Sequence, residues 1–292
     1  MKRSWAAALA VCILCGSLCG CVGKAQTVLF EMPAQPEPMM EELAPSPTDA
    51  VETDSLWEAI QEVAEVILPQ EPDDLEAIPA YTAVSPDVDL SMPMVAVTYD
   101  DGPLDGCTNL ILDILEENGA RATFFIQGKQ AALYPELVKR AYGLGCEIGN
   151  HTYNHKDLTA LDDQDALGQI ESVNSLVAEL TGNGCALVRP PHGRGWRDSR
   201  VLNLVPYPLI MWSIDTKDWS TLNPTKTISA VLDEVKDGDI ILMHDVYPET
   251  VQASTTIIPE LIARGYQLVT VSEMFAAKGL DLSAGSAYRH AG

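Results

Sequence analysis

Met94-Val95-Ala96-Val97-Thr98-Tyr99-Asp100-Asp101-Gly102-Pro103 combines a short apolar run with two adjacent carboxylates. The apolar residues 94–97 predict a strand, and Gly102-Pro103 predicts its end. Because a strand points consecutive side chains to opposite faces, we expect Asp100 and Asp101 to face opposite sides. Like charges repel each other, so two adjacent carboxylates indicate a bound cation or a proton-transfer role.

Strand and helix patterns continue from this stretch toward the end of the chain. Seven strand candidates lie at 94–99, 122–126, 145–150, 186–190, 208–214, 239–244 and 266–271. Helical patterns separate most of them, at 106–118, 129–142, 163–181, 225–236 and 250–264. Alternating strands and helices predict an α/β fold with a parallel sheet, either open or closed into a barrel.

Polar residues with catalytic chemistry follow several of the predicted strands. In folds of this kind the active site lies at the C-terminal ends of the strands. The candidates at these ends are Asp100 and Asp101 after the first strand, His151 after the third, Arg189 in the fourth, Asp215 after the fifth and His244 after the sixth. We therefore expect these residues to form one site.

The histidines His151 and His155 have a spacing typical of metal ligands. On a helical turn, side chains four residues apart lie on one face. With a carboxylate nearby, the pair predicts a two-histidine, one-carboxylate zinc site with open coordination positions. Such a pair also occurs by chance or on a protein surface, so the interpretation depends on the neighbouring motifs.

Arg189-Pro190-Pro191-His192-Gly193 predicts a stiff turn after a strand. The prolines restrict the backbone, and Gly193 lets it approach a ligand. In one interpretation Arg189 fixes a catalytic carboxylate, and a backbone N–H of the turn faces a developing oxyanion. The alternative is a rigid loop whose arginine makes a structural ion pair.

Two further motifs place polar residues after apolar runs. Asp215-Thr216-Lys217-Asp218-Trp219 supplies a carboxylate able to orient a histidine or an arginine. Its tryptophan suits either sugar stacking or the core. His244 follows the strand candidate 239–244, and its place on the same rim favours a general acid or base over a core histidine.

Composition limits the class of protein. The 292-residue chain has a net charge of −24, which disfavours nucleic-acid binding because phosphate recognition needs basic patches. The acidic excess is greatest in 22–92, where 16 acidic residues stand against Lys24 alone. Beyond residue 21 the cysteines are Cys107, Cys146 and Cys185, which predict buried free thiols instead of a disulfide framework.

The N-terminus has the pattern of a secretion signal. Lys2 and Arg3 precede an apolar stretch from Trp5 to Leu18, which is too short for a transmembrane helix. The stretch ends in Leu18-Cys19-Gly20-Cys21, which resembles the bacterial lipobox. The resemblance implies cleavage before Cys21 and lipidation of its thiol. The alternative is an ordinary signal peptide rich in cysteine.

These patterns divide the chain into four parts. Residues 1–21 are predicted to be a lipoprotein signal peptide, and 22–92 an acidic, proline-rich linker with a short helix at 54–68. A catalytic domain is expected at 93–278, followed by a C-terminal tail at 279–292. A lipid anchor and a long linker would hold the domain at the outer side of a cell membrane.

Five ordered motifs together resemble those of the polysaccharide deacetylase family, which is carbohydrate esterase family 4 or the NodB-homology domain. The resemblance covers residues 93–275. The motifs are Thr98-Tyr99-Asp100-Asp101-Gly102-Pro103, His151-Thr152-x-x-His155, Arg189-Pro190-Pro191-His192-Gly193, Asp215-x-x-Asp218-Trp219 and Leu242-x-His244. The resemblance implies a distorted (β/α)7-type barrel.

The resemblance also implies the chemical roles of the central residues. Asp101, His151 and His155 would be ligands of Zn²⁺ or of another divalent transition metal such as Co²⁺, Ni²⁺ or Mn²⁺. Asp100 would be the general base of the reaction, and His244 the general acid.

Further residues would support these roles. Arg189 would hold the base, and Asp218 would support either Arg189 or His244. Trp219 and Leu242 would line the acetyl pocket. The sequence departs from the family pattern at His192, where tyrosine or phenylalanine is usual, and this change bears on the sugar site and on substrate choice. Tyr99, in place of phenylalanine, is a milder departure.

The function implied is a metal-dependent N-deacetylase acting on N-acetylglucosamine in a cell-envelope glycan, with peptidoglycan the first candidate. One alternative is an O-acetyl esterase on acetylated xylan-like polysaccharide. Another is a non-catalytic glycan-binding lipoprotein, which the complete set of candidate catalytic and metal-binding residues disfavours.

Overall fold

A computed structural model describes residues 84–292 of the chain. The predicted signal peptide, the predicted lipidation site Cys21 and the predicted helix 54–68 lie outside these residues, as does most of the predicted linker. Within the described range, no helix is both long and apolar enough to span a membrane.

The core of the fold is a parallel sheet centred on β1 (Met94–Asp100). The strands follow the order β3-β2-β1-β6-β5, formed by β3 (Glu147–Asn150), β2 (Thr123–Ile126), β6 (Ile240–His244) and β5 (Ile214–Asp215). The short strand β7 (Gln267–Leu268) pairs with the beginning of β1. Each apolar run predicted to be a strand therefore contains a strand or, at 186–190, a residue that forms β-bridges, as the α/β prediction requires.

The outer edges of this sheet are joined by an irregular segment. Beyond β3, single parallel bridges run from Asn150 to Val188 and from Val188 to Leu209, the first residue of β4 (Leu209–Ile210). Four residues after Ile210, the same segment forms β5, which pairs with β6 at the other edge. This interrupted closure corresponds to the distorted barrel that the resemblance implied.

Both faces of β1 are apolar because its alternating side chains pack in two different buried clusters. Val95, Val97 and Tyr99 pack in one cluster with residues of α2 (Thr108–Glu117) and α9 (Pro248–Ala263). Met94 and Ala96 belong to a second cluster, whose members from the neighbouring strand segments are Phe125, Leu187, Ile210 and Ile240. Such a layer of side chains fills the interior of a small barrel.

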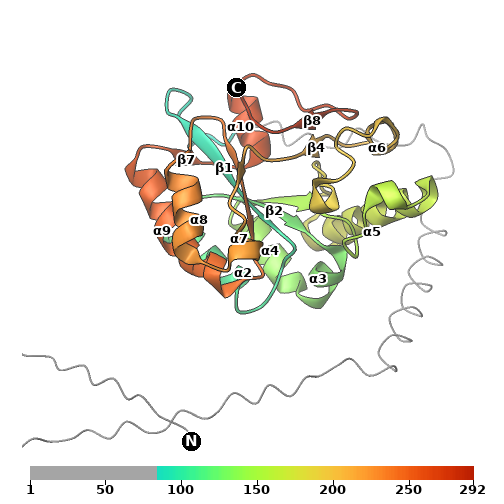
Figure 1. The fold of residues 1–292 in the computed structure, drawn as a ribbon, viewed down its shortest axis with the longest axis horizontal. Coiled ribbons are helices and arrows are strands. Elements are labelled where there is room, and N and C mark those ends of the chain that lie inside the picture. The colour runs from blue at the N-terminus through green and yellow to red at the C-terminus, as the bar shows by residue number, and fades with distance from the viewer. Residues whose placement is uncertain (1–83) are drawn as a thin grey trace, which may run out of the picture. The chain divides into compact units, whose positions relative to one another are not determined.

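Helices surround the strands (Figure 1). Besides α2 and α9, they are α3 (Gly128–Leu133), α4 (Pro135–Gly143), α5 (Asp163–Thr181), α6 (Ser199–Leu204), α7 (Asp218–Thr221), α8 (Pro224–Leu232) and α10 (Val271–Ala277). The helix predicted at 129–142 is divided at Tyr134, which has φ −128° and ψ 55°. The division has a local cause, because proline disfavours helical geometry in the residue before it.

The C-terminal segment 279–292, predicted as a tail, packs onto the fold. Its strand β8 (Ala287–Tyr288) pairs in parallel with β4 (Figure 1). Ala291 is buried in the same apolar cluster as Val271, Met274 and Phe275 of α10. Three cysteines in the described range, Cys107, Cys146 and Cys185, are free and buried, as predicted.

Gly102 illustrates how tightly the end of β1 is packed. Its N–H donates to Oδ1 of Asp245 at 3.0 Å, and a Cβ at this position would collide with that carboxylate. Asp245 is itself buried and accepts a hydrogen bond from the Thr108 hydroxyl at 2.6 Å, so it has little room to move.

We predict that Gly102→Ala lowers the free energy of unfolding by about 1–3 kcal/mol, the usual cost of overpacking. The matched control is Gly168→Ala in α5, where nothing lies within 4 Å of the added methyl group. This control should be stabilising by about 0.5–1 kcal/mol because alanine favours a helix over glycine. Urea denaturation compares the two, and equal effects would contradict the packing described.

Candidate metal and catalytic site

The two adjacent carboxylates at the end of β1 converge on one histidine. Nε2 of His151 lies 3.8 Å from Oδ2 of Asp100 and 3.6 Å from Oδ1 of Asp101. The expectation that the two carboxylates face opposite sides is therefore wrong. The reason is that Asp101 follows the strand with φ 77°, a left-handed conformation that aspartate adopts more readily than most residues.

Asp100 continues the inward alternation of β1 and meets Arg189 inside the barrel. Nη1 of Arg189 donates to Oδ1 of Asp100 at 2.6 Å, and both side chains are buried. The same Nη1 donates to the Thr98 hydroxyl at 2.7 Å. Burial lowers the pKa of Arg189, and the Asp100 carboxylate opposes that shift.

Further contacts fix the guanidinium of Arg189. Its Nε donates to the carbonyl of Ile210 at 3.0 Å and its Nη2 to the carbonyl of Met211 at 3.1 Å. Its central carbon lies 4.0 Å from the centroid of the Phe125 ring. Of the two interpretations from the sequence, this geometry favours an arginine that positions a carboxylate.

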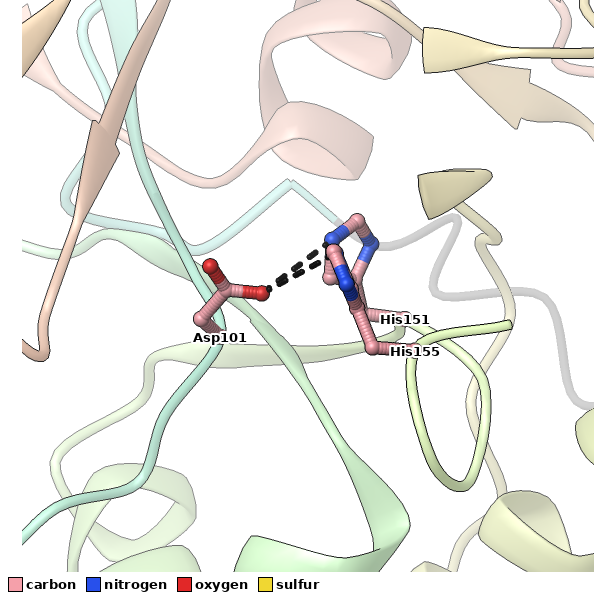
Figure 2. Close-up of side chains that lie close together, drawn as sticks. All are labelled: Asp101, His151 and His155. Carbon is pink, nitrogen blue, oxygen red and sulfur yellow. Dashed lines mark ion pairs between the residues drawn. The ribbon is translucent and has the colours of Figure 1, made fainter. Parts of the chain in front are cut away.

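Asp101, His151 and His155 form a compact group of potential metal ligands (Figure 2). One ligand atom from each lies within 4.8 Å of the others. Oδ1 of Asp101 is 3.6 Å from Nε2 of His151 and 3.3 Å from Nε2 of His155. The same oxygen accepts a hydrogen bond from Nε2 of Gln127 at 2.8 Å, which helps to orient the carboxylate.

The hydrogen bond on the far side of His151 sets its tautomer. Its Nδ1 lies 2.7 Å from the carbonyl oxygen of Arg189, which can only accept. Nδ1 therefore carries a proton, and Nε2 faces Asp101 and His155. A backbone carbonyl or carboxylate in this position is the usual partner of a metal-ligating histidine.

The loop after β3 brings His155 next to His151 without a helix. The helical turn expected from their spacing is absent from residues 151–155, where Thr152 has φ 67° and His155 φ 61°. The side chain of Asn150 stabilises this loop by accepting the Thr152 N–H at 2.9 Å. The two imidazole centroids end 5.0 Å apart.

The electrostatics of this group suit a divalent cation. The pKa of His155 is lowered to about 4, mainly by burial and further by the nearby His151. Its imidazole is therefore neutral at physiological pH. Burial would raise the pKa of Asp101, but His151 and His155 hold it below its usual range. Two imidazole nitrogens and one carboxylate oxygen are a donor set that fits zinc and similar transition metals.

His244, at the end of β6, is paired with Asp218. Its Nδ1 lies 2.8 Å from Oδ1 of Asp218, and its backbone N–H donates to Oδ2 at 2.8 Å. The hydroxyl of Thr250 also donates to Oδ2, at 2.7 Å. Of the two partners left open by the sequence, Asp218 therefore contacts His244 and not Arg189.

This pairing changes the charge of His244. Burial would lower its pKa, but the hydrogen bond and the negative charge of Asp218 raise it to about 9. His244 is therefore protonated at neutral pH, with Nε2 as its second N–H donor. The pKa of Asp218 is lowered by the same contact, against the effect of its burial.

The candidate substrate-binding residues differ in exposure. Trp219 is 53% exposed, which rules out a core role, whereas Leu242 is buried. His192 is exposed and has φ 58°, and its ring lies edge-on to His155 at a centroid distance of 4.6 Å. Asp215 is exposed and accepts the N–H of Lys217, so its side chain supports a turn instead of the buried pairs.

Asp245 belongs to the site region although none of the sequence motifs predicted a role for it. It holds the backbone after Asp101 through Gly102, and burial raises its pKa to about 7. Its position directly after His244 was the available signal. The Gln127 and Thr250 contacts carried no such signal, because they join segments far apart in the sequence.

Comparisons with known proteins agree with this geometry. Residues 87–207 match the sequence profile of the polysaccharide deacetylases. The peptidoglycan-N-acetylmuramic acid deacetylase PdaC of Bacillus subtilis is 37% identical over 65% of this chain, and the match spans 40% of PdaC. A solved structure of PdaC aligns with a TM-score of 0.64, over 66% of this chain and 94% of that structure.

Two other proteins extend the comparison. The peptidoglycan-N-acetylglucosamine deacetylase of Bacillus cereus is 33% identical over 62% of this chain and 68% of its own length. A family 4 acetyl xylan esterase of Clostridium thermocellum, solved with a cobalt ion, is 30% identical with a TM-score of 0.63, over 68% of this chain and 98% of that structure. With the five motifs, the barrel and these relatives in agreement, the chain belongs to the polysaccharide deacetylase family.

Proposed function

We propose that this chain is a metal-dependent N-deacetylase that hydrolyses the acetyl groups of N-acetylglucosamine residues in peptidoglycan. The observation that carries the proposal is the meeting of three groups at one rim. They are the Asp101–His151–His155 cluster, the Asp100–Arg189 pair and the His244–Asp218 pair. The names of the B. subtilis and B. cereus relatives support peptidoglycan as the substrate.

Asp101, His151 and His155 would hold Zn²⁺, or another divalent transition metal such as Co²⁺, Ni²⁺ or Mn²⁺. When bound, such an ion would polarise the acetamide carbonyl and acidify a water molecule. The cobalt ion in the C. thermocellum structure supports a transition metal at this kind of site.

Asp100 is placed to act as the general base. One of its oxygens is held by Arg189, while the other faces the metal-ligand cluster, 3.8 Å from Nε2 of His151. That second oxygen would accept the proton of the water that attacks the acetyl carbon. Arg189 acts by positioning the carboxylate, and the backbone N–H of His192 would donate to the oxygen that gains charge.

His244 is placed to act as the general acid. An amide nitrogen is a poor leaving group, so it must be protonated as the C–N bond breaks. The raised pKa of His244, about 9, keeps the required proton on the imidazole at neutral pH. The products would be acetate and a free glucosamine amine, with Trp219 and Leu242 lining the acetyl pocket and His192 at the sugar.

A second candidate is hydrolysis of O-acetyl groups on a xylan-like polysaccharide. The 30% identity with the acetyl xylan esterase of C. thermocellum is the observation that favours it. The same base and acid would serve an ester, although its alkoxide leaving group depends less on His244. A silent glycan-binding protein is the least favoured interpretation, because each candidate catalytic and metal-binding residue is present.

We also propose an extracytoplasmic location, with the chain anchored to the cell membrane through a lipid on Cys21. The support is the sequence of residues 1–21 and the long acidic linker that follows. Labelling with a radioactive fatty acid, in wild type and in Cys21→Ala, tests this anchor directly.

Asp100→Asn is the most direct test of the catalytic proposal. The variant should release acetate about 10²–10⁴ times more slowly, the range for loss of one acid–base group. The rates are measured on purified peptidoglycan, on N-acetylglucosamine oligomers and on acetylated xylan, with and without added Zn²⁺. Asp281→Asn, which neutralises an exposed carboxylate on the C-terminal segment, is the matched control.

Release from xylan alone would favour the esterase. Release that is equal in wild type and Asp100→Asn would exclude Asp100 as the base, and no release from any substrate would exclude the proposed activity.

Asp218→Asn should move the alkaline limb of the pH–rate profile to lower pH. A general acid works only while protonated, so the rate falls as pH rises through the pKa of His244. Loss of the Asp218 charge lowers that pKa from about 9, and the fall should therefore begin at lower pH. Asp215→Asn, a change of equal charge at an exposed position of the same motif, should leave the limb in place. Identical shifts in the two variants would contradict the pairing.

A further inference from the structure

The arginines of this acidic protein are almost all paired. Residues 84–292 contain eight arginines, and six of them lie within 4.0 Å of a carboxylate, namely Arg121, Arg140, Arg189, Arg194, Arg200 and Arg264. Arg197 and Arg289 have no carboxylate partner in this part of the chain. In a chain with a net charge of −24, two such guanidinium groups call for an explanation.

Both arginines lie against the same tryptophan. The guanidinium carbon of Arg197 is 3.9 Å from the ring centroid of Trp196, and that of Arg289 is 5.6 Å from it. Nε of Arg289 donates to the carbonyl of Trp212 at 3.1 Å, which fixes the side chain while its two terminal nitrogens stay without a carboxylate in the described range. Both arginines are exposed, so their charges are accessible from solvent.

Trp196 and Arg289 line a hollow of about 270 Å³. Its other lining residues are His192, Gly193, Met211 and Trp212. Two tryptophans give the hollow aromatic walls, and Arg289 adds a positive charge. Arg197 does not line the hollow itself but lies over the ring of Trp196. We call this feature the Trp196 hollow.

The Trp196 hollow adjoins the metal-ligand cluster. His192 lines the hollow, and its ring lies 4.6 Å, edge-on, from the ring of His155. Gly193, the next residue, packs tightly against the wall of the hollow, because a Cβ there would meet Trp212 at 2.8 Å and Met211 at 2.9 Å. A glycan that places one sugar at the cluster would therefore place a neighbouring sugar near the hollow.

We propose that the Trp196 hollow is a subsite for a sugar residue that carries a carboxylate, next to the residue that is deacetylated. This inference rests on the proposed function. In peptidoglycan the carboxylate has two chemical sources. One is the lactyl carboxyl of a muramoyl sugar that carries no peptide, and the other is the stem peptide where one is attached through that carboxyl. Guanidinium groups beside an aromatic ring suit such a ligand, because they bind carboxylates through paired hydrogen bonds.

The two arginines would strengthen the binding of charged substrates and would add nothing to the binding of neutral ones. Chitin-like oligomers carry no carboxylate, so the hollow would contribute only ring contacts to their binding. Charged glycans would gain an additional interaction that weakens as salt concentration rises, because both guanidinium groups are exposed. The arginines would act on substrate choice and would take no part in bond breaking.

The test compares glycan strands that differ only in charge. Peptidoglycan strands freed of peptides by an amidase carry free lactyl carboxylates, and the same strands coupled to methylamine carry none. The kcat/KM for acetate release is measured with both, with peptide-bearing strands and with N-acetylglucosamine oligomers. The variants are Arg197→Gln, Arg289→Gln and their combination, and Arg264→Gln on α9 is the control of equal charge change.

Wild type should prefer the charged strands over the methylamide strands, and the double variant should lose about threefold to tenfold of that preference. The range is modest because exposed charge pairs are individually weak. The loss should appear in KM more than in kcat, and Arg264→Gln should retain the wild-type preference. Loss on bare strands would identify the lactyl carboxylate, and loss on peptide-bearing strands alone would identify the stem peptide.

Binding separates this subsite from the proposed activity. Calorimetry with Asp100→Asn measures strand affinity without turnover, and adding Arg197→Gln and Arg289→Gln should weaken binding of the charged strands only. Equal affinity for charged and methylamide strands would overturn the subsite even if acetate release is normal. Absent acetate release with charge-selective binding would overturn the catalytic proposal and leave the subsite standing.

Discussion

The buried ion pair between Asp100 and Arg189 is the interaction on which the site depends. An arginine with no exposed surface inside a barrel is tolerated only if its charge and its hydrogen-bond donors are satisfied. Asp100 supplies the charge, while Thr98, Ile210 and Met211 accept the remaining hydrogen bonds. These partners come from β1 and from the irregular segment that joins the two edges of the sheet. The pair therefore ties barrel closure to the position of the candidate base.

Arg189 also connects the base with the metal-ligand cluster. Its backbone carbonyl accepts a hydrogen bond from Nδ1 of His151, and this contact orients the imidazole toward Asp101 and His155. The residues that follow it lead to His192 and the Trp196 hollow. One residue thus sets the geometry of the carboxylate, of a metal ligand and of the turn beside the sugar site. On the opposite side of the rim, the Asp218–His244 pair is built independently from β6 and α7.

Much of this arrangement could be predicted from the sequence because it follows from periodicity. The apolar runs at 94–99 and 239–244 became β1 and β6, and the polar residues at their ends came together at one rim. The backbone conformations of Asp101 and His155 could not be predicted in this way. Their positive φ values leave no trace in a periodic pattern, and they overrode both the strand alternation and the helical spacing.

The partners of single side chains were equally out of reach of the sequence. Asp218 could serve Arg189 or His244, and only the fold decided between them. Arg289 lies 5.6 Å from the ring of Trp196 although they are 93 residues apart in the sequence, because it belongs to a C-terminal segment that carried no pattern of its own. Composition alone does indicate why such an arginine is unusual. In a strongly acidic chain most arginines are expected to have a carboxylate partner.

A cobalt titration tests whether Asp101, His151 and His155 together form one metal site. The chain without residues 1–21, whose four cysteines would compete for metal, is stripped with a chelator and titrated with Co²⁺ by calorimetry and visible absorption. We expect one Co²⁺ ion per chain, with affinity reduced at least about 100-fold in His155→Ala. His290→Ala, at an imidazole outside the cluster, should bind as wild type does. Equal binding by wild type and His155→Ala would show that His155 is not a metal ligand and would contradict the three-residue site.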